Sequence, residues 1–235
     1  MEPMALDAGE PTRPGARPKM PQPRILHESE HLLVLDKPAG WHTTAPGESQ
    51  EDAEPGQPSI ESHLRSHHDW AADLPDAGLL HRLDQPTTGC IAAAKTSDQW
   101  HRLRQLWSGS TIGKTYLALV APAPPDVGRF DLHFTSRYRR SRKVTVSGDG
   151  ETNTRGRCTW RRIAGDDHGT LLKVELVGPG QRHQVRAGLA HCGHPILGDP
   201  LYGGNGPMLC LHAWRLRIEG VEIQADSPAW ARLGE

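Results

Sequence analysis

The sequence has no excess of positive charge, which limits how the protein could bind a polyanion. It contains 27 lysine and arginine residues against 28 aspartate and glutamate residues, so its formal net charge is -1 with histidine neutral. A positive field around the whole molecule, which would draw nucleic acid in, is therefore excluded. Any nucleic-acid site has to be a local cationic patch.

Paired cysteines and long apolar runs are also missing. The four cysteines, Cys90, Cys158, Cys192 and Cys210, include no C-x-x-C pair. Nothing in the sequence resembles a signal peptide, and no apolar run is long enough to span a bilayer. Together these absences predict a soluble protein of the reduced cytoplasm that does not act at a membrane.

The first part of the chain differs in composition from the rest. At 235 residues the chain is long enough to fold as one domain with a substantial core. Residues 1–22, however, are rich in proline and charge and contain few large apolar side chains. Such a segment buries too little apolar surface to offset the entropy lost on ordering. We therefore expect a disordered leader over residues 1–22 and a single folded domain over residues 23–235.

The densest group of reactive side chains is His81-Arg82-Leu83-Asp84, a base, a cation and an acid within four positions. Pro86 restricts the residue before it to extended geometry, and Thr87-Thr88-Gly89 is typical of a turn. Short apolar runs on either side predict that the group lies at the tip of a connection between buried segments. An arginine neighbour favours the ionised form of Asp84, and a carboxylate so placed can act as nucleophile, general base or metal ligand. The alternative is a capping aspartate in a surface ion pair.

Regular elements are predicted on both sides of this loop. Residues 59–68 have the spacing of a short amphipathic helix, and residues 114–120 alternate as a strand should. Residues 98–107 predict a second helix, preceded by a capping box formed by Thr96 and Gln99. The aromatic residues of that helix follow one stripe, a pattern more typical of a core than of a base-stacking surface.

A dense basic run lies in residues 136–143, Ser-Arg-Tyr-Arg-Arg-Ser-Arg-Lys. Cations at this density, with a tyrosine among them, suit a loop that follows phosphates better than they suit a core element. The alternative is an ordinary solvated surface. Such a patch would position a nucleic acid without reading its sequence. The cations are Arg137, Arg139, Arg140, Arg142 and Lys143.

Several of these stretches together resemble one enzyme family. The string from His81 to Gly89 resembles the catalytic signature H-R-L-D-x-x-T-[ST]-G of the RluA-type RNA pseudouridine synthases, with Thr88 where serine is commoner. Residues 114–118 are similar to the K-x-Y-x-A strand that supplies the family's active-site tyrosine. Residues 32–40, an apolar run ending in Asp-Lys-Pro-Ala-Gly, resemble the family's first motif, in which Lys37 would support the floor of the site.

Residues 179–186, Pro-Gly-Gln-Arg-His-Gln-Val-Arg, open a predicted helix and resemble the family motif T-G-R-x-H-Q-[IV]-R. Pro179 replaces threonine, and Gln181 replaces arginine, with Arg182 one position later. Moving a cation by one position along a helix turns it by about 100°, so Arg182 is not expected to substitute. The final arginine, Arg186, is kept, and in the family it pairs with the catalytic aspartate. The departures affect RNA positioning or substrate choice more than the chemistry.

Two further stretches extend the resemblance toward the C-terminus. Residues 193–203 resemble the turn G-x-P-I-x-G-D-x-x-Y-G, and residues 209–213 resemble the closing L-H-A strand. The resemblance therefore covers the chain from about Arg24 to Pro228. Many relatives carry a small RNA-binding domain at the N-terminus, which a leader as short as residues 1–22 cannot form, so no separate domain of that kind is expected.

The resemblance implies an α+β fold, one catalytic domain around a mixed, mainly antiparallel, bent sheet flanked by helices, with the active site in a central cleft. It implies a cytoplasmic isomerase, expected to be a monomer, that converts uridines of structured ribosomal or transfer RNA into pseudouridine without a metal or organic cofactor. The catalytic residues would be Asp84, Tyr116 and Arg186. The residues expected to hold the RNA are His81, Arg82, Arg139, Arg140, Arg142 and Lys143.

Two alternatives from other classes remain. His27-Glu28-Ser29-Glu30-His31 matches H-E-x-x-H, a zinc hydrolase signature that works only on a helix, where both imidazoles share one face. Residues 32–35 that follow are strand-like, and no third ligand is evident. A non-catalytic RNA-binding module would keep the basic run but would have no need of Asp84.

Overall fold

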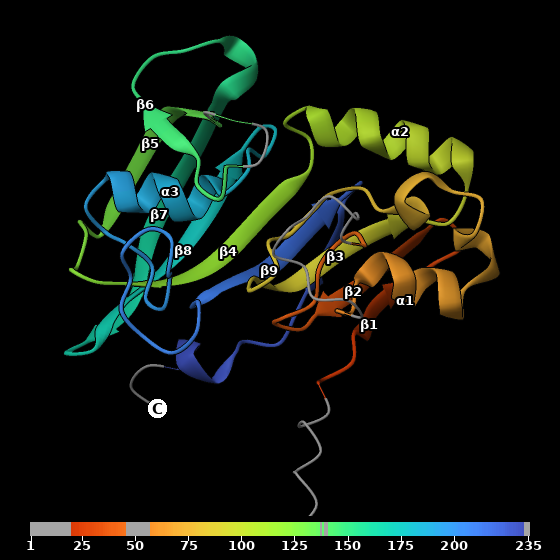
Figure 1. The fold of residues 1–235 in the computed structure, drawn as a ribbon, viewed down its shortest axis with the longest axis horizontal. Coiled ribbons are helices and arrows are strands. Elements are labelled where there is room, and N and C mark those ends of the chain that lie inside the picture. The colour runs from red at the N-terminus through yellow and green to blue at the C-terminus, as the bar shows by residue number, and fades with distance from the viewer. Residues whose placement is uncertain (1–19, 46–56, 137, 139–140, 233–235) are drawn as a thin grey trace, which may run out of the picture.

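The computed structural model describes residues 20–45, 57–136, 138 and 141–232, which form one sheet flanked by helices (Figure 1). Most of the leader predicted for residues 1–22 lies outside the described residues. The α-helices are α1 (Ile60–His67), α2 (Ser97–Ser108) and α3 (Gln184–His191). The strands are β1 (Arg24–Glu28), β2 (Leu32–Lys37), β3 (Thr88–Ala94), β4 (Gly113–Val120), β5 (Val127–Thr135), β6 (Thr145–Ser147), β7 (Arg155–Asp166), β8 (Gly169–Val177), β9 (Leu211–Ile218) and β10 (Val221–Gln224).

The sheet is mixed and mainly antiparallel, as the family resemblance implied. Its described strands run in the order β1-β2-β3-β9-β4-β8-β7-β5-β6, and β10 pairs with β9. Strands β3 and β9 form the parallel pair, and the other pairs in this order are antiparallel. Segments far apart in the sequence, β3 and β9, therefore meet in the middle of the sheet (Figure 1).

Strand β2 is apolar on both faces because a different helix covers each face. Leu32 and Val34 pack in a buried cluster with side chains of α2, whereas Leu33 and Leu35 pack with side chains of α1. Alternate side chains of a strand point to opposite faces, so a continuous apolar run is what a strand between two layers requires. The strand predicted at residues 32–35 is confirmed.

The two helices predicted on this half of the sheet are also confirmed. The hydroxyl of Thr96 caps α2 by accepting a hydrogen bond from the Gln99 N–H at 3.3 Å. The hydroxyl of Ser59 caps α1 in the same way. The ring of Trp100 packs against the core, and its Nε1 donates to the Leu79 carbonyl at 3.1 Å. The aromatic stripe of α2 is therefore part of the core.

Helix α3 covers the other half of the sheet, over β5 and β7. Gly188 approaches the ring of Phe130 so closely that a Cβ at this position would lie 2.3 Å from it. The helix begins at Gln184, later than the predicted start at residue 179. His183 adopts a left-handed backbone conformation, with φ of 55°, and so prevents the helix from extending toward the N-terminus.

The two halves of the sheet meet where β3, β9 and β4 run together. Tyr116 on β4 packs against the buried clusters of both halves. The loop that ends in β3 carries Asp84, and the first turn of α3 carries Arg186. The junction therefore collects the three predicted catalytic residues from separate parts of the chain. Among the described residues, no helix has the length and apolar character needed to cross a membrane.

Candidate active site

Asp84 lies on a loop whose backbone is fixed on both sides. The Thr87 N–H donates to the Asp84 carbonyl at 3.0 Å and closes a tight turn. The Thr43 hydroxyl donates to the Leu83 carbonyl at 2.7 Å and accepts from the Leu83 N–H at 3.0 Å. The predicted turn at residues 87–89 is thus shifted to residues 84–87, because Thr88 already belongs to β3. These bonds leave the Asp84 carboxylate free for other contacts.

Lys37 ties the end of β2 to this loop. Its buried Nζ donates to the carbonyls of Pro38, Trp41 and Gln85 at 3.1, 2.7 and 2.9 Å. Burial lowers the pKa of Lys37 to about 7, while the charge of Asp84 acts in the opposite direction. Because the Gln85 carbonyl directly follows Asp84, Lys37 helps set where the carboxylate stands.

Arg186 is a buried cation shared by two carboxylates. Its Nη1 donates to Asp84 Oδ2 at 2.8 Å, while Nε and Nη2 donate to both oxygens of Asp199 at 2.8 and 2.9 Å. The Asp84 side chain is 25% exposed, whereas those of Arg186 and Asp199 are 3% and 0% exposed. Only Asp84 of the two acids is therefore open to a substrate.

Arg186, Asp84 and Asp199 stabilise one another in their charged forms. Burial alone would lower the pKa of Arg186, but the hydrogen bonds and charges of Asp199 and Asp84 outweigh it and raise the pKa. Burial alone would raise the pKa of Asp199, but Arg186 and the N–H groups of Leu201 and Tyr202 lower it. A charge-assisted, bidentate pair of this kind fixes the plane of the guanidinium, and with it the direction of Nη1 toward Asp84.

His183 faces the second oxygen of Asp84. Its Nε2 lies 3.6 Å from Asp84 Oδ1, and its Nδ1 lies 2.8 Å from the Tyr202 hydroxyl. The Tyr202 oxygen accepts the Val144 N–H at 2.9 Å, so its own proton is available to His183 Nδ1. Burial lowers the pKa of His183, against the opposing charge of Asp84. A neutral imidazole in this tautomer carries its proton on Nε2, toward the carboxylate.

Tyr116 contributes an aromatic ring and a neutral hydroxyl. Strand β4 holds it opposite Val174 of β8 and Ala213 of β9. Burial raises the pKa of Tyr116 well above its ordinary value, and the charge of Asp84 raises it further. Within the described part of the chain, no group hydrogen-bonds to its hydroxyl. The arrangement combines an open, held carboxylate with a protonated phenol in one low-dielectric site.

Comparison with known proteins identifies the family. Residues 31–191 match the family described as RNA pseudouridylate synthase. The chain belongs to this family. The predicted resemblance, the fold class and the class of enzyme are thereby confirmed.

Relatives and solved structures agree with this assignment. The ribosomal large subunit pseudouridine synthase D of Pseudomonas aeruginosa is 31% identical over 225 residues, which cover 87% of this chain and 67% of that protein. The protein of the same name from Nitrosomonas europaea is 32% identical, over 83% of this chain and 57% of its own length. The chain thus spans between about half and two thirds of the length of the curated relatives it matches.

The solved structures support the fold alone, because the sequence identity is low. Human RNA pseudouridylate synthase domain containing 4 superposes with a TM-score of 0.68 at 22% identity, covering 88% of this chain and 90% of that chain. Human RNA pseudouridylate synthase domain containing 1 superposes with a TM-score of 0.66 at 20% identity, covering 92% and 87%. The sheet and helices described above are therefore those of a pseudouridine synthase domain.

The residues predicted to bind RNA divide into three groups. Arg82 is exposed beside Asp84. His81 instead stacks on Trp107 with 4.4 Å between ring centroids, and its Nε2 accepts the Ala92 N–H at 3.1 Å. Burial lowers the pKa of His81 to about 3, so it is a neutral packing group, and its role in substrate binding stays a prediction. The third group is the basic run.

Part of the basic run lies outside the described residues, namely Arg137, Arg139 and Arg140. Arg142 and Lys143 are described and exposed. The C-terminal end of the run is joined to the site, because Arg182 Nη2 donates to the carbonyls of Ser141 and Arg142 at 2.6 and 3.1 Å, and the Val144 N–H donates to the Tyr202 hydroxyl.

We expected residues 181 and 182 to lie on a helix, where a shift by one position turns a side chain by about 100°. That premise was wrong. Residues 181–183 precede α3, so a one-residue shift there does not rotate a side chain about a helix axis. Arg182 reaches the basic run, as described above. Gln181 Nε2 donates to the carbonyls of Asn153 and Arg155 at 2.9 and 3.2 Å, which ties the start of α3 to β7.

Sequence reasoning missed Asp199, His183 and Tyr202. All three stand inside stretches that resemble family motifs, which was the available signal. Their contacts join Arg186 to a residue 13 positions later, and His183, just before α3, to Tyr202 in a later loop. No local spacing rule predicts such contacts. The zinc alternative fails on local structure, because His27 and Glu28 lie on strand β1 and the described residues hold no cluster suited to a metal ion.

Proposed function

We propose that this chain isomerises uridine to pseudouridine in large-subunit ribosomal RNA, with Asp84 as the reacting acid. The observation that carries the proposal is the open Asp84 carboxylate held by Arg186 beside Tyr116. The names of the relatives support the choice of RNA, since those from Pseudomonas aeruginosa and Nitrosomonas europaea are named ribosomal large subunit pseudouridine synthases. The proposed catalytic domain is residues 23–235, acting in the cytoplasm as a monomer without a cofactor.

A uridine inside folded RNA has to leave its stack before Asp84 can reach it. Extrusion of a base costs a few kcal/mol, which phosphate and stacking contacts on the protein offset. Arg82, exposed and two residues from Asp84, is suited to fill the vacated space or to brace the extruded nucleotide. The ring of Tyr116 is suited to stack on the uracil.

The reaction exchanges one glycosidic bond for another. The bond between uracil N1 and the anomeric carbon breaks, the uracil turns, and a bond from carbon 5 to the anomeric carbon forms. Carbon 5 loses its proton and N1 gains one, so the product is an isomer of the substrate. Asp84 has three available roles in this sequence: attack on the ring, attack on the anomeric carbon, or removal of a ribose proton. Tyr116, held as a neutral phenol, can remove the carbon 5 proton only while passing its own proton on, for which Asp84 is the near acceptor.

Arg186 and His183 orient the reacting acid. Arg186 occupies Oδ2 of Asp84, and His183 lies toward Oδ1. The hydrogen bond from Arg186 and the neighbouring His183 ring limit rotation of the carboxylate, which favours one attack geometry. We assign the basic run, Arg139, Arg140, Arg142 and Lys143, to phosphate contacts that position the RNA without reading its sequence.

The test is release of tritium from ribosomal RNA labelled at uridine carbon 5. Wild-type protein should release tritium, and Asp84→Asn and Asp84→Ala should release none while retaining the wild-type circular dichroism spectrum. Asp226→Asn is the matched control, because it removes a carboxylate that is 78% exposed and pairs with Arg24 at the surface. Undiminished release by the Asp84 variants would remove Asp84 from the chemistry. Tight RNA binding by wild type without release would favour a non-catalytic binding module.

A further inference from the structure

The sheet has an outer face that α3 does not cover. Along β5 and β7 the side chains alternate between buried and exposed, and the buried ones, such as Phe130 and Cys158, face α3. The exposed side chains therefore point away from α3. An antiparallel sheet commonly leaves one face to solvent, so exposure by itself carries no meaning. What distinguishes this face is its excess of positive charge.

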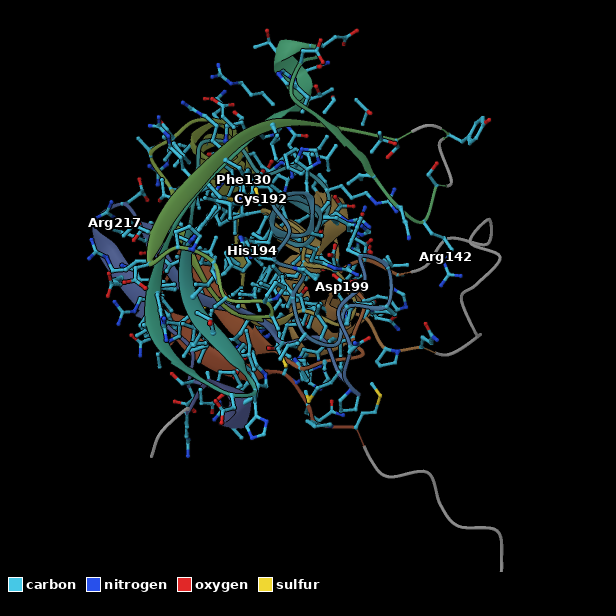
Figure 2. All side chains as sticks on the ribbon, turned by 90° about the vertical axis from the view of Figure 1, so that its left-hand side faces the viewer. Phe130, Arg142, Cys192, His194, Asp199 and Arg217 are labelled. Atoms are coloured by element: carbon cyan, nitrogen blue, oxygen red, sulfur yellow. The ribbon has the colours of Figure 1, made fainter. Side chains whose placement is uncertain are left out.

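The outer face is opposite the active site. Glu175 on β8 pairs with Thr115, and Thr115 pairs with Arg215, so these side chains and that of Arg217 share one face of the sheet. In Figure 2 Arg217 lies at the left edge of the strands, and Asp199 lies on the other side of them. A ligand on the outer face is thus separated by the sheet from the Asp84 site.

The acids of this face are already paired. Both oxygens of Asp131 accept hydrogen bonds from the Arg155 guanidinium, and Glu175 pairs with Lys173 at 2.7 Å. These pairs account for Asp131 and Glu175, and Asp166 at the end of β7 accepts hydrogen bonds from the N–H groups of His168 and Gly169. Arg162 of β7 pairs with Asp126 at 3.6 Å.

Three arginines remain, Arg129, Arg157 and Arg161, here called the outer-face arginines. All are exposed, and in the described residues none makes an ion pair or a side-chain hydrogen bond. Arg157 stands opposite Asp131 across the ladder, but Asp131 is occupied by Arg155.

Their register brings these three positive charges together. Arg129 pairs with Thr159, so Arg157 and Arg161 are its two diagonal neighbours, roughly 7–8 Å away at the backbone. Like charges so close repel one another, and a bound polyanion would relieve that repulsion.

A hollow of about 550 Å³ opens beside two of the outer-face arginines, Arg129 and Arg161, across β5, β7 and β8. Val127 and Thr159 of the outer face line it, together with Gly128 and Trp160 of the same strands. The Trp160 indole itself packs on the side toward α3, against Phe130. The rim of the hollow carries Arg129, Arg161 and the Lys173–Glu175 pair. The surface is a shallow depression with a cationic rim and is not an apolar groove.

We propose that the outer-face arginines bind the phosphates of a second segment of the same RNA, remote from the segment held at Asp84. Protein surfaces that contact nucleic acid are more polar and more positive than those that contact protein, and phosphate is the natural partner of an unpaired guanidinium. Because the overall charge is -1, this local excess is not part of a general positive charge on the molecule. The inference rests on the proposed function, since a folded ribosomal RNA is large enough to reach both sides of the domain.

The experiment compares two triple variants in full-length protein. Arg129→Gln, Arg157→Gln and Arg161→Gln together remove the outer-face arginines. Arg24→Gln, Lys95→Gln and Arg102→Gln remove three surface cations that are each paired with an acid elsewhere on the fold. Both variants lose three positive charges, so any difference between them reflects position. Tritium release is measured against concentration for in vitro transcribed large-subunit ribosomal RNA, and binding is measured for a short uridine-containing hairpin.

The outer-face variant should show KM for the long RNA raised about tenfold or more near physiological salt, with the logarithmic salt dependence reduced by about 2. The control variant should match wild type, and both variants should bind the short hairpin as wild type does. Equal KM values of the two variants for the long RNA would overturn the proposal. It would also be overturned if the outer-face variant lost as much affinity for the short hairpin as for the long RNA. Absence of tritium release by wild type would instead overturn the proposed function.

Discussion

Replacing Asp199 by asparagine should destabilise this protein far more than the same change at Asp84, although both acids bind the same arginine. Asp199 is fully buried and holds Arg186 through two hydrogen bonds, at 2.8 and 2.9 Å. Asp84 is 25% exposed and accepts one, at 2.8 Å. The two substitutions are chemically identical, so their difference reports how the charge of Arg186 is neutralised.

The magnitude follows from what each change leaves behind. Removing one partner of a buried ion pair costs about 3–5 kcal/mol, because the other charge stays buried without compensation. In Asp199→Asn, Arg186 keeps its bond to Asp84 and one amide oxygen, so we expect the lower end, about 3 kcal/mol. In Asp84→Asn the bidentate pair with Asp199 is intact, and the expected cost is about 1 kcal/mol, that of one hydrogen bond.

Urea denaturation followed by tryptophan fluorescence measures both values, since the chain has seven tryptophans. The midpoint should fall markedly for Asp199→Asn and only slightly for Asp84→Asn, with unchanged slopes. Tritium release should show the reverse order, with none from Asp84→Asn and reduced release from folded Asp199→Asn. Equal midpoint shifts for the two variants would refute the division of Arg186 between a structural and a reacting acid.

Two further predictions concern Lys37 and Arg182. Burial lowers the pKa of Lys37 to about 7 from 10.5, so between these values the unfolded chain binds more protons and the free energy of unfolding should rise with pH. Lys37→Met should lose this rise in urea titrations from below pH 7 to about pH 10, and an unchanged slope would contradict it. Arg182→Ala frees the basic run from α3, so KM for RNA should rise severalfold with kcat retained. A parallel fall in kcat would show that Arg182 acts on the chemistry instead.

The sequence predicted best where a signal is local. The apolar run of β2, the capping residues of α2 and the alternating pattern of β4 are each contained within about a dozen residues. All three predicted elements are present in the structure. The contact between Asp84 and Arg186 joins residues 102 positions apart, and only the resemblance to a family could predict it. The periodicity of apolar residues predicts single helices and strands, but it does not predict which loop contacts which helix across the sheet.

The features that the sequence could not predict depend on register or on left-handed backbone. The outer-face arginines come from β5 and β7, and only the pairing of Arg129 with Thr159 brings them together. The start of α3 at Gln184 depends on the left-handed conformation of His183, a residue type with no strong preference to signal it. The turn at residues 84–87 depends on Thr88 joining β3.

Two departures from the family motif, at Gln181 and Arg182, fall on residues that anchor neighbouring segments and do not contact the acid. Gln181 fastens the start of α3 to β7, and Arg182 fastens the basic run to it. His183 and Arg186, which face the two oxygens of Asp84, match the motif. A change in how the basic run is anchored alters where phosphates can lie relative to Asp84 while leaving the carboxylate and its donors in place. Differences between this protein and its relatives should therefore appear in the choice of RNA and in KM, and not in the bond that is exchanged.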